Sequence, residues 1–221
     1  MKIINQTAKI LWPLAEEEGR AALRRCEYGG RVCYNSVNKI QPDSYKKFTE
    51  NLYRNGHCSP LEHAFVTVEF VTGRDVLAEL TRHRLASFSV ESQRYVLNDA
   101  TGDISFIKPL FYIEPNYQTK DFTDKWYASR IWENSMKRAE TDYICLVHEC
   151  NMPPEDARKV LPNSVATRIV MSCNIRELLH ILDLRTSQRA YPEIRELMSL
   201  LEKELERVYP HVLTLKELKE E

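Results

Sequence analysis

The chain has 221 residues, of which 43% are apolar and 29% are charged, and its formal net charge is −1. This is the composition of a globular protein that can bury a substantial core, and the missing basic excess argues against a dedicated nucleic-acid or membrane-surface binder. No apolar run has the length of a membrane span and none resembles a signal peptide, so we expect a cytoplasmic protein.

The first part of the chain predicts a strand and two helices. Loose alternation favours a strand over residues 2–10. Residues 15–28 have a helical pattern, and Gly29-Gly30 stands where a C-terminal cap is expected. Pro42-Asp43 opens a second helix, which ends before Gly56.

The next segment changes from helix to strand and back. Ser59-Pro60-Leu61-Glu62 has the form of a capping box with proline at the first helical position. Residues 65–71 are β-branched and aromatic, so we expect one helical turn that feeds a strand. Residues 74–84 predict a helix, with Arg82-His83-Arg84 at its C-terminal end, where cations suit the helix dipole.

The rest of the chain alternates helices with short strands. These elements favour an α+β fold, in a single domain over residues 1–221, with long helices on a mainly antiparallel sheet. The predicted strands cover residues 104–108 and 165–171. The predicted helices cover residues 118–149 as one helix or two, 153–160, 175–184 and 192–208.

The segment from Arg82 to Tyr95 is the most informative part of the chain. It holds three arginines, one histidine and three serines in fourteen residues. Guanidinium forks and hydroxyls together commonly hold phosphate oxygens. An exposed basic helix end followed by a polar loop is the plain alternative.

The order R-H-R, seven residues, S and then Q-R-Y resembles the signature of the flavin-dependent thymidylate synthases. Three further segments resemble the same family in order and spacing: Gly56-His57-Cys58-Ser59-Pro60-Leu61-Glu62-His63, then Ala157 to Pro162, then Asn174-Ile175-Arg176 with Leu184-Arg185. One short motif can arise by chance, whereas four in register are hard to explain in that way.

The resemblance implies an enzyme that converts dUMP to dTMP. It implies FAD as cofactor, 5,10-methylenetetrahydrofolate as one-carbon donor, NADPH as reductant, and a homotetramer whose subunits share the flavin. The flavin-binding residues it implies are His57, Ser59, Glu62, Arg82, His83, Arg84, Asn174, Arg176 and His180. The dUMP-binding residues it implies are Glu79, Arg82, Val90, Ser92, Gln93, Arg94, Arg158 and Arg185.

Arg185 is the residue expected to carry the chemistry. The resemblance places it against the uracil ring, where a fixed positive charge stabilises electron density that hydride addition pushes into the ring. His180 has a simpler alternative as a partly buried helix residue. Ser92 is expected to bind substrate and not to attack it, since no base is evident beside it.

Two positions depart from the family pattern and bear on specificity. Val90 stands where many members have Gln or Glu, and Glu79 stands where many have Gln. A carboxylate near a substrate phosphate repels it, so Glu79 must face a hydroxyl or pair with an arginine. Methylation or hydroxymethylation of another pyrimidine nucleotide therefore stays open.

Two other classes of protein fit less well. A non-catalytic flavin or nucleotide sensor need not keep Arg94, Arg158 and Arg185 together. An RNA-binding module built on the arginine segment lacks both a basic excess and interleaved aromatic residues.

The six cysteines predict neither a metal site nor a nucleophile. None forms a C-x-x-C pair, and the grouping of Cys145, His148 and Cys150 is more simply explained by helix residues. In a cytoplasmic protein they are expected to be reduced thiols that fill core space.

Overall fold

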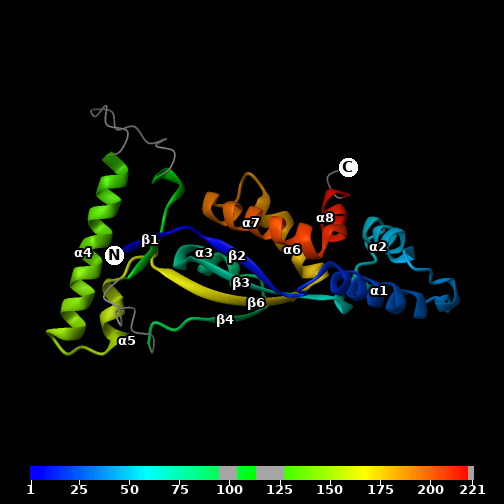
Figure 1. Ribbon diagram of the computed structural model, residues 1–221, viewed down its shortest axis with the longest axis horizontal. Helices are drawn as coiled ribbons and strands as arrows, with labels where there is room; N and C mark the ends of the chain where they lie inside the picture. Colours follow the sequence, from blue (N-terminus) through cyan, green and yellow to red (C-terminus); the bar gives the residue numbers. More distant parts are fainter. Residues whose placement is uncertain (95–103, 113–126, 219–221) are drawn as a thin grey trace. The chain divides into compact units, whose positions relative to one another are not determined.

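A computed structural model of the protein describes residues 1–94, 104–112 and 127–218. It has the α+β architecture expected from the sequence (Figure 1). The strands are β1 (Lys2–Ile4), β2 (Thr7–Trp12), β3 (Phe65–Gly73), β4 (Ser87–Val90), β5 (Ser105–Ile107) and β6 (Ala166–Asn174). The α-helices are α1 (Glu16–Val32), α2 (Ser44–Arg54), α3 (Arg74–Leu80), α4 (Tyr127–His148), α5 (Pro154–Ala157), α6 (Ile175–Thr186), α7 (Pro192–Val208) and α8 (Pro210–Glu217). Short 3-10 helices cover Val37–Lys39, Ser59–His63 (η2), Leu110–Tyr112 and Arg158–Val160 (η4).

Four strands form a mainly antiparallel sheet in the order β2-β3-β6-β4, and β1 pairs with β5 in parallel. Every second residue of β3 and of β6 is buried, as one covered face of a sheet requires. On β3 these are Val66, Val68, Phe70 and Thr72, and on β6 they are Thr167, Ile169, Met171 and Cys173.

The chain divides into two compact units. Unit 1 comprises residues 1–6, 71–80 and 90–169, and unit 2 comprises residues 7–70, 81–89 and 170–221. The prediction of a single synthase domain over residues 1–221 stays a prediction.

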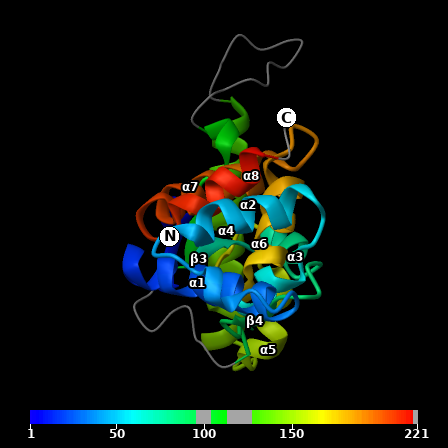
Figure 2. The ribbon, with the colours of Figure 1, turned by 90° about the vertical axis from the view of Figure 1, so that its right-hand side faces the viewer.

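Unit 2 holds most of the helices. α7 packs on β2 and on α6, and α1, α2 and α8 lie together beside them (Figure 2). α7 buries residues at helical spacing, among them Ile194, Leu197, Leu201 and Leu205. The prediction over 192–208 therefore agrees with the observed helix.

Unit 1 is built around the long helix α4, which contacts α5 and η4. Its core contains Ile104, Phe106, Met136, Tyr143 and Val165. Residues 127–148 form one helix and not two, whereas the predicted part over 118–126 lies outside the described residues.

The predicted cap at Gly29-Gly30 is wrong, because α1 continues through both glycines to Val32. The glycines are needed for close packing. A Cβ at Gly29 would lie 2.8 Å from the His63 ring, and one at Gly30 would lie 2.7 Å from the Phe48 ring. Gly56 does play the expected part, since its φ of 71° is in the left-handed region after α2.

The structure differs from the prediction at other elements as well. Residues 2–10 form two strands separated by Asn5 and Gln6. η2 begins at Ser59, and its N-cap, Cys58, makes no side-chain capping bond, so the capping box does not form. The strand β4 and the helix α8 were not predicted.

The helix predicted over 74–84 ends at Leu80, so Arg82-His83-Arg84 lies in a turn and not at a helix end. The amide of Ala86 donates to the carbonyl of His83 at 3.1 Å in this turn. The His83 side chain is buried while both arginines are exposed, an arrangement that the turn accommodates. No described helix is both long and apolar enough to cross a membrane.

Candidate functional site

In unit 2, the arginine turn meets helix α6 through His83. The Nε of Arg185 on α6 donates to the Nε2 of His83 at 3.0 Å. On the other side of the ring, Nδ1 lies 3.4 Å from the Oε1 of Glu177. The structure therefore brings together His83, which the family resemblance assigns to flavin, and Arg185, which it assigns to the pyrimidine.

Burial sets the charge of this group. Desolvation lowers the pKa of His83 to about 4, and the positive charge of Arg185 and the ring of His180 act in the same direction. Desolvation also raises the pKa of the Glu177 carboxyl. At neutral pH the ring of His83 is consequently uncharged.

His180, also on α6, is exposed, so the alternative of a partly buried helix residue is wrong. Its ring meets that of His83 edge to face, with centroids 6.0 Å apart. The exposed ring is available to a ligand, as the flavin prediction requires.

The start of α6 joins two other predicted flavin residues. Asn174 caps the helix, because its side-chain oxygen accepts from the amide of Glu177 at 2.9 Å. Arg176 in the first turn pairs with Glu62 of η2 at 2.7 Å. These contacts give Asn174 and Glu62 structural roles that do not depend on a ligand.

His57, Ser59, Arg82 and Arg84 are all exposed in unit 2. Exposed guanidinium, imidazole and hydroxyl groups are suited to phosphate oxygens, so the donor set fits the pyrophosphate of a flavin dinucleotide. The structure leaves the flavin assignment of these residues as a prediction.

Unit 1 contains three of the predicted dUMP-binding residues, Ser92, Arg94 and Arg158. Arg94 pairs with the Glu155 carboxylate at 3.0 Å, and the Nε of Arg158 donates to the Glu155 carbonyl at 3.1 Å. The Ser92 hydroxyl accepts from the Arg94 amide at 3.2 Å. Segments more than sixty residues apart thus bring two arginines and a hydroxyl to one place in this unit.

Arg74 is a member of this group that the sequence analysis missed. Its Nη2 donates to the Glu91 carbonyl at 3.3 Å, while its Nε is buried without a hydrogen-bond partner. Burial lowers its pKa, and the nearby Arg158 adds to the effect. The Nε2 of Gln93 is likewise a buried donor without a partner.

There is a simple reason why the sequence analysis did not identify Arg74. It opens a predicted helix beside Asp75, and nothing in the pattern distinguishes it from a solvated charge. The signal that identifies it is the buried Nε, which only coordinates show.

The two departures from the family pattern are both accessible. Glu79 is half-buried on α3, and Val90 is 36% exposed at the end of β4. A role for Glu79 or Val90 in substrate choice stays a prediction.

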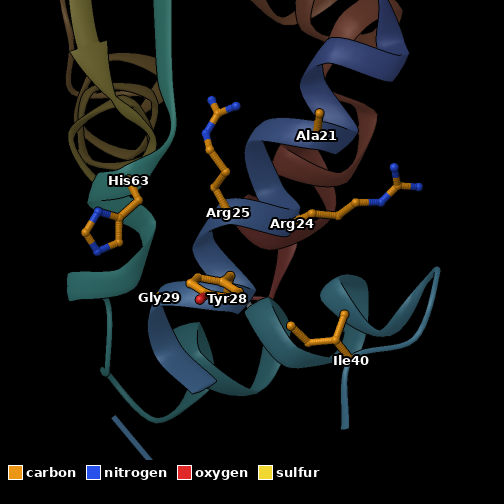
Figure 3. Close-up of a pocket in the computed structure, with 7 residues that line it drawn as sticks. All are labelled: Ala21, Arg24, Arg25, Tyr28, Gly29, Ile40 and His63. Carbon is orange, nitrogen blue, oxygen red and sulfur yellow. The ribbon is translucent and has the colours of Figure 1, made fainter. Parts of the chain in front are cut away.

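A separate cavity of about 630 Å³ lies in unit 2 and contains none of the predicted site residues. Figure 3 shows Arg25 rising from α1 on the side that faces His63, whereas Arg24 extends away from it. The other lining residues are Ala21, Tyr28, Gly29 and Ile40. The adjacent Glu62 belongs to the flavin prediction, but His63 itself is accounted for by its packing on Gly29.

Cys26, Cys58 and Cys173 are unlike activated nucleophiles. Burial raises the pKa of the Cys26 and Cys173 thiols to about 12 in each case, and it also raises that of Cys58. Within residues 1–94, 104–112 and 127–218, no three His, Cys, Asp or Glu side chains are grouped so as to hold a metal ion.

Comparison with known proteins identifies the family to which the chain belongs. Residues 17–211 match the family model of the thymidylate synthase complementing proteins. A flavin-dependent thymidylate synthase of Halobacterium salinarum is 38% identical over 165 residues, which are 68% of this chain and 66% of that protein. A probable flavin-dependent thymidylate synthase of Mycobacterium phage D29 is 31% identical over 205 residues, which are 89% of this chain and 84% of that protein.

The chain therefore spans about two thirds of the length of the Halobacterium relative. Among solved structures, a UMP/dUMP methylase from Streptomyces cacaoi bound with 5-Br dUMP superposes with a TM-score of 0.77. The superposition covers 97% of this chain and 96% of that one, at 23% sequence identity. At this identity the likeness establishes a shared fold.

Proposed function

Because the chain belongs to the family of thymidylate synthase complementing proteins, we propose that it is a flavin-dependent thymidylate synthase. The reaction is the reductive methylation of dUMP to dTMP, with 5,10-methylenetetrahydrofolate as one-carbon donor and NADPH as reductant. When bound, FAD supplies the hydride. The relatives that match at 31–38% identity carry the name flavin-dependent thymidylate synthase, which supports this choice.

The observation that carries the proposal is that Arg74 Nε and Gln93 Nε2, both in unit 1, are buried donors without acceptors. Unsatisfied buried donors are costly and are rare in folded proteins. A nucleotide phosphate that accepts from them, with Arg94, Arg158 and Ser92 alongside, removes this cost. We assign these five residues to the dUMP phosphate.

The pyrimidine is assigned to Arg185. Its guanidinium, fixed by His83, stabilises negative charge on the ring when the substrate accepts hydride. Glu79, Arg82 and Val90 complete the proposed substrate set. No thiolate is needed, which agrees with the raised pKa of Cys26, Cys58 and Cys173.

Flavin is assigned to the accessible donors of unit 2. Arg82, Arg84 and Arg176 meet the pyrophosphate, while His57, Ser59, Glu62, Asn174 and His180 contact the remainder. Because these residues are dispersed along a small subunit and the cofactor is extended, we propose a homotetramer in which different subunits complete each site.

A second candidate substrate is UMP. The structural neighbour is described as a UMP/dUMP methylase, and Val90 and Glu79 are the positions at which this chain departs from the family pattern. The test is to purify the protein, record its absorption spectrum, and offer dUMP and UMP separately with methylenetetrahydrofolate and NADPH. A flavin spectrum with dTMP formation supports the proposal, and a colourless protein that makes no methylated nucleotide with added FAD contradicts it.

A further inference from the structure

We propose that His83 is a positioning residue for Arg185, and that Glu177 in turn fixes the orientation of the His83 ring. This inference rests on the proposed function, in which Arg185 acts on the pyrimidine. It gives His83 a role that differs from the flavin contact implied by family resemblance.

Hydrogen-bond chemistry determines the state of the ring. A guanidinium can only donate, so the Nε2 that lies 3.0 Å from Arg185 Nε must carry a lone pair and no proton. In a neutral imidazole the proton is then on Nδ1, which faces the Glu177 carboxylate at 3.4 Å. Each ring nitrogen is therefore matched to its neighbour, and neither is left for a flavin.

The position of the three residues explains why the ring can hold the arginine. Glu177 and Arg185 are eight residues apart on α6, about 12 Å along a helix axis, and His83 comes from the separate arginine turn. The side chains of His83 and Glu177 are only 4% and 6% exposed. A buried ring with one tautomer gives the long Arg185 side chain a fixed acceptor.

The charges of the group agree with this role. The neutral ring of His83 lies between the negative carboxylate of Glu177 and the positive guanidinium of Arg185, so the net charge of the three side chains is zero. A protonated ring would direct an N–H at the Arg185 Nε–H and lose the bond. The three side chains are thus arranged to keep Nε2 as an acceptor.

Three substitutions at position 83 separate positioning from simple packing. The Gln side chain reaches about as far as Nε2, and its oxygen can accept from Arg185. The Asn side chain reaches only about as far as Nδ1, and Leu provides no acceptor. We expect kcat to fall by about ten- to a hundredfold in His83→Asn and His83→Leu, with His83→Gln retaining clearly more, and flavin content unchanged in all three.

A double-mutant cycle tests whether the effect passes through Arg185. If it does, His83→Leu combined with Arg185→Ala is no slower than Arg185→Ala alone. Equal kcat in folded Gln, Asn and Leu variants, or fully additive losses in the double variant, would overturn the proposal. Loss of flavin from all three variants would restore the direct flavin role and overturn it as well.

A measurement without turnover keeps this test apart from the proposed function. Nitrogen NMR of histidine-labelled protein at pH 7 should show His83 with a proton on Nδ1 and none on Nε2. The opposite tautomer contradicts the positioning role whether or not the enzyme is active. A wild-type protein that shows the expected tautomer but makes no dTMP contradicts the proposed function. In that case, nucleotide binding replaces kcat as the quantity measured in the double-mutant cycle of His83 and Arg185.

Discussion

Arg94 and Glu155 form an ion pair in unit 1, with Arg94 Nε 3.0 Å from Glu155 Oε2. Both side chains are about half exposed, so the pair is a weak one that a phosphate can replace. Glu155 also accepts from Arg158 through its carbonyl, which holds the two arginines near one another. Glu155 therefore pairs with Arg94, a cation that we assign to the dUMP phosphate.

Replacing Arg94 with Ala should raise the dissociation constant for dUMP at least about tenfold, since loss of one partner of a desolvated charge pair costs about 2–5 kcal/mol. Flavin binding should not change. Glu155→Gln should instead tighten dUMP binding, by up to about fivefold, because an exposed ion pair contributes at most about 1 kcal/mol. Calorimetric titration measures both, with Lys159→Ala as the control for a nearby exposed cation.

Arg185→Ala should lower kcat by about two to three orders of magnitude, the usual effect of removing one preorganised electrostatic contact. The flavin spectrum should be retained, because Arg185 is not among the residues that we assign to flavin. Arg189→Ala is the matched control, since Arg189 is an exposed arginine just beyond α6. Steady-state rates of dTMP formation compare the two, and similar losses would count against a special role for Arg185.

Catalysis should survive removal of the cysteines. The thiols of Cys26 and Cys173 have a pKa raised to about 12, so at pH 8 both are protonated and poor nucleophiles. A variant with Ala at these two positions and Ser at the other four should keep most of its kcat, provided that circular dichroism shows it to be folded. A folded variant that binds both ligands and is inactive would point to a thiolate mechanism.

Stability should decrease as the pH falls from about 6.5 to about 4, because His83 takes up a proton in the unfolded chain over this interval and stays neutral in the folded one. The full contribution is on the order of 3 kcal/mol, since burial lowers the pKa of His83 from its usual 6.5 to about 4. The raised pKa of Glu177 acts in the opposite sense. Urea unfolding at pH 7 and pH 5 measures the change in the free energy of unfolding, which should be smaller in His83→Gln than in the wild type. An equal change in both proteins would show that His83 is not neutral in the folded protein over this interval.

The sequence predicts the regular elements well where side-chain periodicity is strong. The helix predicted over 192–208 is present, and so is the strand beginning at Phe65, which its β-branched and aromatic residues predict. Glycine was misleading: Gly29 and Gly30 suggested a helix end by local rules, but their role is to admit the rings of His63 and Phe48. Such contacts depend on residues distant in sequence and leave no local pattern.

The sequence proposes which residues belong to the candidate site, but it does not show how they are arranged. Family motifs identify Arg94, Arg158 and Arg185, since each motif is short and ordered along the chain. They do not show that His83 turns inward to Arg185, or that the Nε of Arg74 is buried without a hydrogen-bond partner. Both facts follow from burial, which one sequence does not specify for an individual polar side chain.

The most direct test of the account is the origin of the hydrogen added to the nucleotide. Protein whose flavin has been reduced chemically in D₂O, with no nicotinamide present, is mixed with dUMP and methylenetetrahydrofolate for one turnover. The account predicts dTMP that carries deuterium in its new methyl group, in an amount no greater than the bound flavin, and no product from protein stripped of flavin. Product formed at the same rate without flavin, or only with unlabelled hydrogen, would contradict a flavin-dependent reaction.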